Sequence, residues 1–316
     1  MALGFKMGSS GGESGAKVYV DGEKVNAKEV QILNVPSGNS VSVNLNYNRS
    51  TLPYNFFNGS AVVYNNEIHI LGGLNNYYKH YKWNGSTWSN VSTLPYGFYQ
   101  GSAVVYNNEL HILGGNYNSS LRTRHYKWDG TSWTEVSTLP YNFYQGRAVV
   151  YNNGIHILGG NSGSQQHYIW NGSTWSNSTG IPYYFYYGSA VVYNNEIHIL
   201  GSSYSSSIST RHYKWNGSSW SSVSTLPYNF YAGTAVVYNN GIHIMGNQGS
   251  GSQSIKHYRW NGTSWTEVST LPYEFYQGSA VVYNNGIHIL GGGNSGSDIN
   301  HYLISMYIDK VVESIT

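Results

Sequence analysis

Histidine is the residue type whose number and spacing in this chain most suggest chemistry. The 12 histidines fall in two motifs that recur along the sequence, a hydrophobic-His-Ile motif and a His-Tyr motif. The first motif contains His69, His111, His156, His198, His243 and His288, and the second contains His80, His125, His167, His212, His257 and His301. A zinc site needs three or four ligands, whereas this spacing brings at most two histidines of one repeat together. We therefore expect structural histidines and no metal.

Acidic residues and cysteine would offer covalent or acid–base chemistry. The chain has no cysteine, so a thiol nucleophile and a disulfide framework are both excluded. A glycosidase needs two carboxylates flanking the scissile bond, and Glu274 and Asp298 are the one pair in segments that vary between repeats. A glycosidase using this pair stays a minor alternative. We expect a protein that is not an enzyme and has no cofactor.

The elements that position these residues are repeated six times. A Leu-Pro-Tyr or Ile-Pro-Tyr segment begins at Leu52, Leu94, Leu139, Ile181, Leu226 and Leu271, so the period is 42 or 45 residues. Such a period indicates a repeat architecture. Each period reads as four short strands, and the Asn-Gly pairs at Asn84, Asn171, Asn216 and Asn261 predict two-residue type I′ turns between the third and fourth strands. Six such sheets packed radially predict an all-β, six-bladed β-propeller of four-stranded antiparallel blades.

The repeats resemble the kelch family. The resemblance rests on a Gly-Gly pair after the second strand, as at Gly72-Gly73 and Gly114-Gly115, a Tyr in the third strand, as at Tyr81, and a Trp in the fourth, as at Trp88. It covers about residues 50 to 302. The sequence departs from the family pattern at Gly201-Ser202 and Gly246-Asn247, and the sixth repeat lacks both tryptophans.

The chain divides into three predicted segments. Residues 1–14 are rich in Gly and Ser and predict a flexible arm, and residues 15–39 predict a β-hairpin with Asp21-Gly22 at its turn, which would attach the protein to a larger assembly. Residues 40–316 predict the kelch-like propeller, with the ring closed by a strand at about residues 40–48. The C-terminal segment is also long enough to complete blade six, and that alternative stays open.

One face of the predicted disc varies between repeats, which is typical of a recognition surface. It carries the loop after the second strand and the loop that leads into each blade, which we call the lead-in loop. In each lead-in loop the third residue after Pro, as in Phe56, is predicted to be core, and the residue before Gly is predicted to face solvent. That position holds Asn58, Gln100, Gln145, Tyr187, Ala232 and Gln277. The candidate ligand-binding residues are Asn58, Tyr77, Tyr78, Gln100, Tyr117, Arg122, Arg124, Gln145, Tyr184, Tyr187, Tyr204, Arg211, Lys256 and Gln277.

The chemistry of these residues favours sugar. Aromatic rings can cover the apolar face of a sugar while amides meet its hydroxyls, and the chain has 32 tyrosines. Cations before the third strands, including Lys79, Arg124 and Lys256, form a rim that could attract an anionic polymer or could only keep a strand end solvated. The 16 Lys and Arg are scattered and the net charge is +2, so we expect no nucleic-acid partner.

These observations predict a non-catalytic binding module, most specifically a phage or prophage tail protein that recognises a bacterial surface polysaccharide or other glycan. The N-terminus contains no apolar signal-peptide region, and no run approaches the length of a membrane span. We therefore expect a location in the virion or outside the cell without a Sec signal, and no membrane partner. The alternative is a structural or scaffolding propeller, virion-associated or cytoplasmic, that docks a protein. A continuous apolar variable face would favour docking, and isolated aromatic slots lined with amides would favour sugar.

Overall fold

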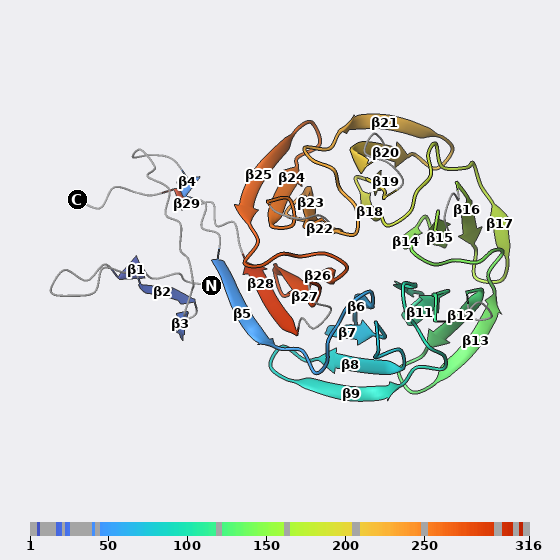
Figure 1. Ribbon diagram of the computed structural model, residues 1–316, viewed down its shortest axis with the longest axis horizontal. Coiled ribbons are helices and arrows are strands. Elements are labelled where there is room, and N and C mark those ends of the chain that lie inside the picture. The colour runs from blue at the N-terminus through green and yellow to red at the C-terminus, as the bar shows by residue number, and fades with distance from the viewer. Residues whose placement is uncertain are drawn as a thin grey trace.

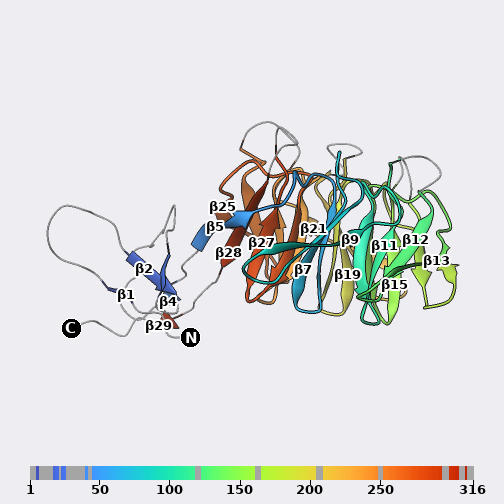
Figure 2. The same ribbon diagram turned by 90° about the horizontal axis from the view of Figure 1, so that it is seen from below.

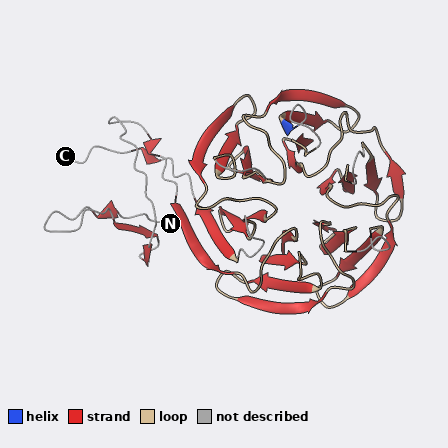
Figure 3. Ribbon diagram, viewed as in Figure 1, coloured by secondary structure: helices blue, strands red, loops and turns tan. Residues whose placement is uncertain are grey.

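Six four-stranded antiparallel sheets surround a central axis and form a closed β-propeller (Figure 1). The computed structural model describes residues 45–117, 122–160, 165–203, 209–247, 252–293 and 299–305, and also five short strands near the chain ends. In blades one to five the strands follow sequence order, with the first strand nearest the axis and the fourth at the rim (Figures 1 and 3). The predicted fold class is therefore confirmed.

The strands begin and end at nearly the same positions of each repeat, because each repeat contains the same pattern of β-branched and aromatic residues. Their strands, in order from blade one to blade six, are β6 (Ser60–Tyr64), β7 (Glu67–Leu71), β8 (Lys79–Trp83) and β9 (Trp88–Thr93); β10 (Ser102–Tyr106), β11 (Glu109–Leu113), β12 (Arg124–Trp128) and β13 (Trp133–Thr138); β14 (Arg147–Tyr151), β15 (Gly154–Leu158), β16 (His167–Trp170) and β17 (Trp175–Asn177); β18 (Ser189–Tyr193), β19 (Glu196–Leu200), β20 (Arg211–Trp215) and β21 (Trp220–Thr225); β22 (Thr234–Tyr238), β23 (Gly241–Met245), β24 (Lys256–Trp260) and β25 (Trp265–Thr270); and β26 (Ser279–Tyr283), β27 (Gly286–Leu290), β28 (Asn300–Ser305) and β5 (Leu45–Thr51).

The fourth strand of blade six comes from the N-terminal side of the chain. Strand β5 pairs with β28 in a register that runs from Leu45 opposite Ser305 to Thr51 opposite Asn300. The sequence placed a closing strand at about residues 40–48, whereas β5 occupies Leu45–Thr51. The remaining strands lie outside the ring: β1 (Phe5–Lys6), β2 (Lys17–Val20) and β3 (Glu23–Val25) form one sheet, and β4 (Ser40–Val41) pairs with β29 (Lys310–Val311).

Of the two tight turns in each of blades one to five, only the one between the third and fourth strands differs from the prediction. The two-residue turn lies between the first and second strands, where Tyr64 pairs with Glu67 and both Asn65 and Asn66 have positive φ, as a type I′ turn requires. The predicted Asn84-Gly85 turn is instead part of a four-residue loop, because the last pair of its hairpin is Trp83 with Trp88.

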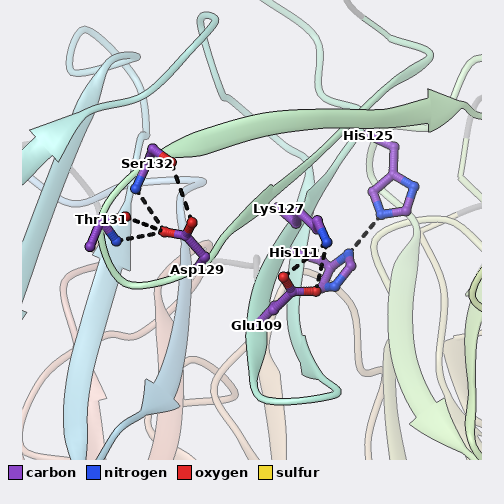
Figure 4. Close-up of polar contacts among 7 residues, drawn as sticks. All are labelled: Glu109, His111, His125, Lys127, Asp129, Thr131 and Ser132. Atoms are coloured by element: carbon purple, nitrogen blue, oxygen red, sulfur yellow. Dashed lines mark hydrogen bonds and ion pairs between the residues drawn. The ribbon is translucent and has the colours of Figure 1, made fainter.

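In that loop the asparagine acts through its side chain. The Oδ1 atom of Asn84 accepts hydrogen bonds from the backbone N–H groups of Ser86 and Thr87, both at 2.9 Å, and Gly85 alone takes a positive φ. Blade two has Asp129 at this position, and its carboxylate accepts the equivalent bonds from Thr131 and Ser132 (Figure 4). These hydrogen bonds to the ionised form lower the pKa of Asp129 to about 2.

The core lies between neighbouring blades rather than within one blade. One cluster combines Leu71 of blade one with Phe98, Leu110 and Ile112 of the next repeat. The lead-in phenylalanines are 0 or 1% exposed, which confirms that they are core residues. This set consists of Phe56, Phe98, Phe143, Phe185, Phe230 and Phe275.

One glycine per blade allows this packing. Gly72 has a φ of +60°, and a Cβ at this position would collide with the carbonyl oxygen of Phe98 in the next lead-in loop. The same glycine is present in all six repeats, but the second glycine of the pair is dispensable. Where it is replaced, the side chains of Ser202 and Asn247 accept hydrogen bonds from backbone N–H groups of the lead-in loops, at 3.2 and 3.0 Å.

The histidines link adjacent blades through a chain of buried hydrogen bonds. In blade two, His111 Nδ1 lies 2.8 Å from His125 Nε2 (Figure 4), and His125 Nδ1 lies 2.9 Å from the hydroxyl of Ser137. Trp175, on β17 of the next blade, donates its indole N–H to the same hydroxyl at 3.1 Å. Burial lowers the pKa of His111 to about 4 and that of His125 to about 3, so both rings are neutral at physiological pH.

Candidate ligand-binding site

The described parts of the loops that vary between repeats lie on one face of the disc. The end of each loop after the second strand is hydrogen bonded to the next lead-in loop: Phe98 N–H donates to the carbonyl of Tyr77 at 2.8 Å, and Phe143 N–H donates to that of Arg122 at 2.9 Å. The strands run between the two faces of the disc, as the edge-on view shows (Figure 2). The two sets of loops therefore form one surface, which we call the variable face.

Three predicted tyrosines form an aromatic platform on the variable face between blades one and two. The rings of Tyr77 and Tyr117 lie 4.5 Å apart between centroids, and those of Tyr78 and Tyr117 lie 5.8 Å apart. Tyr78 is 44% exposed and Tyr117 is 42% exposed, and these are the two most exposed large aromatic side chains in the described part of the chain. We refer to Tyr77, Tyr78 and Tyr117 as the tyrosine platform.

A glycine found in only one lead-in loop makes room for this platform. A Cβ at Gly97 would collide with the ring of Tyr117. The equivalent positions of the other blades carry Asn55, Asn142, Tyr184, Asn229 and Glu274. The backbone also holds the platform in place, because the carbonyl of Tyr78 accepts a hydrogen bond from Leu94 N–H at 2.9 Å. The sequence alone did not identify Gly97, although it was visible as the exception among the six loops.

The residues before Gly in the lead-in loops meet at the axis. Each N–H donates to the carbonyl of the equivalent residue in the preceding blade, at 2.6 to 2.9 Å, and the six bonds close a ring. All six residues have positive φ, which aligns their peptide groups around the axis. This axial ring consists of Asn58, Gln100, Gln145, Tyr187, Ala232 and Gln277. The prediction that the position faces solvent is wrong for Gln100, which is 9% exposed, and for Ala232, which is 2% exposed, because the ring brings these side chains against their neighbours.

Side chains of the axial ring form a polar network over the channel. Gln145 Nε2 donates to the Gln100 side-chain carbonyl at 2.7 Å and to the hydroxyl of Tyr187 at 2.8 Å. Gln100 Nε2 donates to the same hydroxyl from two blades away. Burial raises the pKa of Tyr187, so its hydroxyl stays protonated.

The tyrosine platform is continuous with this network. The ring of Tyr99 lies 6.0 Å from that of Tyr77, and its hydroxyl accepts a hydrogen bond from Gln100 at 3.2 Å. Asn116, next to Tyr117 in the chain, donates to the side-chain carbonyl of Gln100 at 3.2 Å. Exposed aromatic rings therefore lead into amide and hydroxyl groups, which is the combination that a sugar needs. The sequence-based list omitted Tyr99 and Asn116.

The predicted cationic rim is partly neutralised. Arg124 forms an ion pair with Glu135, and Lys256 forms one with Glu267 at 2.6 Å. The hydrogen bond and the negative charge of Glu135 raise the pKa of Arg124. The other two predicted arginines lie over aromatic rings of their own surroundings: Arg122 is 4.6 Å from the Tyr144 ring centroid, and Arg211 is 5.6 Å from that of Tyr183.

The remaining candidates are not gathered into one site. Tyr184 is half-buried in the lead-in loop of blade four, away from the tyrosine platform. Tyr204 and Asp298 lie outside the described residues, so the pair proposed for a glycosidase is represented only by Glu274. Within the described ranges no group of three or more His, Cys, Asp or Glu could hold a metal ion. The same residues include no helix long and apolar enough to cross a membrane.

Comparison with known proteins establishes the fold alone. No family model matches the chain, and no curated protein matches it significantly. Among solved structures 442 chains match. One of them, described as "Structure of YjhT", superposes with a TM-score of 0.71 at 15% sequence identity, covering 81% of this chain and 96% of that one.

Proposed function

We propose that this propeller is a non-catalytic glycan-binding module and that its ligand is a bacterial surface polysaccharide held on the variable face. The sugar stacks on the exposed rings of Tyr78 and Tyr117, and its hydroxyls meet the polar groups that lead toward the axis through Tyr99, Asn116 and Gln100. The observation that carries the proposal is the tyrosine platform, whose exposed rings are linked through Tyr77 to Tyr99, where the hydroxyl accepts a hydrogen bond from the Gln100 amide.

The alternative of a protein-docking propeller would be favoured by a continuous apolar variable face. In the described ranges the large hydrophobic side chains with the greatest exposure are Tyr78, Tyr117 and Ile299. The rings of Tyr78 and Tyr117 lie side by side and Ile299 is in blade six, so the exposed aromatic area is small and isolated. Obligate protein interfaces have more apolar and larger central patches. The distribution of exposed side chains therefore supports sugar.

Binding of the labelled full-length protein to an array of bacterial surface polysaccharides tests the proposal. We expect saturable binding to at least one glycan. In the double variant Tyr78→Ala with Tyr117→Ala, we expect the dissociation constant to rise about thirtyfold, because truncating an aromatic anchor costs about 2 kcal/mol or more. The matched control is Ile299→Ala, which removes a similarly exposed apolar side chain outside the platform.

Two results would contradict the proposal. The first is wild-type protein that binds no glycan on the array. The second is a platform variant that binds with the affinity of the wild type or that loses no more affinity than Ile299→Ala. Tyr78→Phe separates stacking from hydrogen bonding, since it retains the ring, and we expect it to bind within a few-fold of the wild type.

The placement of this module in a phage or prophage tail stays a prediction from the sequence. It rests on the absence of cysteine, on the repeated blades with one variable face and on the N-terminal segment with its predicted attachment hairpin. Detection of the protein in purified virions of a lysogen, by peptide mass spectrometry, would test this placement separately from glycan binding.

A further inference from the structure

Among the described residues that line the central channel, one side chain is charged. Beneath the axial ring, a cavity of about 140 Å³ is lined by the first residues of the six innermost strands. In blades one, two, four, five and six this residue is Ser60, Ser102, Ser189, Thr234 and Ser279, and in blade three it is Arg147. By the same measure of volume a water molecule needs about 10–15 Å³, so the cavity has room for an ion of several oxygen atoms.

Arg147 has no acidic partner there. None of the residues that line the cavity is an aspartate or glutamate. The one described hydrogen bond of its guanidinium runs from Nη1 to the carbonyl of the adjacent Gly146, at 3.0 Å. A guanidinium has five N–H donors and no acceptor, so further donors are available to the cavity. Enclosure by protein lowers the pKa of Arg147 to about 10, which still leaves it charged at neutral pH.

The surrounding hydroxyls are also arranged as donors. The oxygen of Ser102 accepts a hydrogen bond from Ala148 N–H at 3.0 Å, and that of Ser60 accepts one from Ala103 N–H at 3.1 Å. The equivalent bonds are made by Ser189 and Ser279. Because each of these oxygens accepts a backbone N–H, its own hydroxyl hydrogen is left to donate. The cavity therefore combines one positive charge with a ring of hydroxyl donors.

We infer that this channel cavity binds a small oxyanion, of the phosphate or sulfate class, through the Arg147 guanidinium and the hydroxyl ring. Arg147 is half-buried and has no carboxylate beside it, so an anion is the partner its charge favours, and arginine suits such anions because its planar fork can donate two parallel bonds. The inference is independent of the tyrosine platform. The oxyanion is either a free ion or an acidic substituent of a larger ligand, and both have the same chemistry at the arginine.

The matched variant is Arg147→Ser, which gives blade three the residue that four other blades carry. Isothermal titration calorimetry of the full chain uses inorganic phosphate and sulfate, with chloride as the background salt. We expect saturable binding by the wild type and an affinity lower by about tenfold or more in Arg147→Ser, because a hydrogen bond to a charged group is lost. Arg147→Lys retains the charge without the fork, and we expect an intermediate affinity.

A second measurement keeps the test valid if the calorimetric signal is small. In buffer without phosphate or sulfate, Arg147→Ser should have a higher melting temperature than the wild type, because it removes a charge that has no acidic partner. The new serine oxygen can also accept a hydrogen bond from a backbone N–H of the next blade, as Ser102 does from Ala148. Added phosphate should raise the melting temperature of the wild type only. Absence of saturable binding by the wild type, or equal binding by Arg147→Ser, would overturn the inference.

Glucose 6-phosphate and glucose distinguish the two sources of the anion. If glucose 6-phosphate binds more tightly than inorganic phosphate, the natural anion is an acidic substituent of a larger ligand. If glucose 6-phosphate does not bind and inorganic phosphate does, the natural anion is a free ion. Because the Tyr78 and Tyr117 variants leave Arg147 in place, failure of glycan binding and failure of anion binding are separable results.

Discussion

Acidification should unfold this propeller through its buried histidines. Burial lowers the pKa of His69, His111, His156, His198 and His243 to about 4 and that of His80, His125, His167 and His212 to about 3, and it lowers the pKa of His257 well below 6.5. An unfolded histidine has a pKa of about 6.5, so unfolding takes up protons below that pH. The stabilisation is therefore fully present above pH 6.5 and is lost as the pH falls toward 4.

The size of the effect follows from these values. Between pH 7 and pH 5, each such histidine reduces the free energy of unfolding by about 1.8 kcal/mol. Ten of them together reduce it by about 18 kcal/mol, and at pH 6 the reduction is already about 7 kcal/mol. Because a folded domain has a stability of about 5–15 kcal/mol, the midpoint of acid unfolding should lie between about pH 6 and pH 5.

The assay is urea unfolding monitored by tryptophan fluorescence, repeated at intervals from pH 7.5 to 5. We expect the urea midpoint to fall steeply below pH 6.5. A urea midpoint that is unchanged between pH 7 and pH 5 would refute the reasoning, because the histidines would then be accessible to protons in the folded state. Replacing His198 and His212 together by Gln should remove about 3.6 kcal/mol of the difference between pH 7 and pH 5, whatever its effect at neutral pH.

Two further substitutions test the contacts between blades. Gly114→Ala should destabilise the fold by about 3 kcal/mol or more, because Gly114 has a positive φ and the added Cβ would collide with the carbonyl oxygen of Phe143. Chemical denaturation measures the loss of stability. A loss below about 1 kcal/mol would contradict the geometry. Ser137→Ala should cost about 1–3 kcal/mol by leaving His125 and the indole N–H of Trp175 without their shared partner, and a neutral effect in the same assay would show that this hydrogen bond adds nothing.

The sequence predicted the blades well because the repeats align residue by residue. The period and the alternation of the strands indicate the four-stranded sheets, and the constancy of Phe56 and its equivalents indicates burial. The turn between the third and fourth strands was less predictable: the Asn-Gly motif was assigned to a two-residue turn, but the side chain of Asn84 caps a longer loop, whereas the turn at Asn65-Asn66 does have two residues. Both motifs contain the residues that tolerate positive φ, so composition alone does not separate them.

The site was predicted in part, because a sequence contains no information on distance from the axis. Six copies of one position meet around the channel, and this places Gln100 and Ala232 against neighbours instead of solvent. The pairing of Arg124 with Glu135 did leave a signal in the sequence. Only the repeats of blades two and five have Glu at this position of the fourth strand, and both have a cation at the start of the neighbouring third strand. Arg147 was equally visible as the one charged residue at its position, but its importance depends on the cavity that the ring encloses.

The pairing of β5 with β28 determines how the ring responds to mechanical force. The chain enters β5 at Leu45 and leaves β28 at Ser305, and these two residues are opposite each other. Tension between the two chain ends would peel the strands apart one pair at a time. A force applied between the N-terminal side and the variable face would instead run along the backbone of β5 into the lead-in loop of blade one. The hydrogen bonds between β5 and β28 would then be loaded together, in shear. A propeller held from its N-terminal side would thus resist a pull applied at its variable face better than a pull between its own ends.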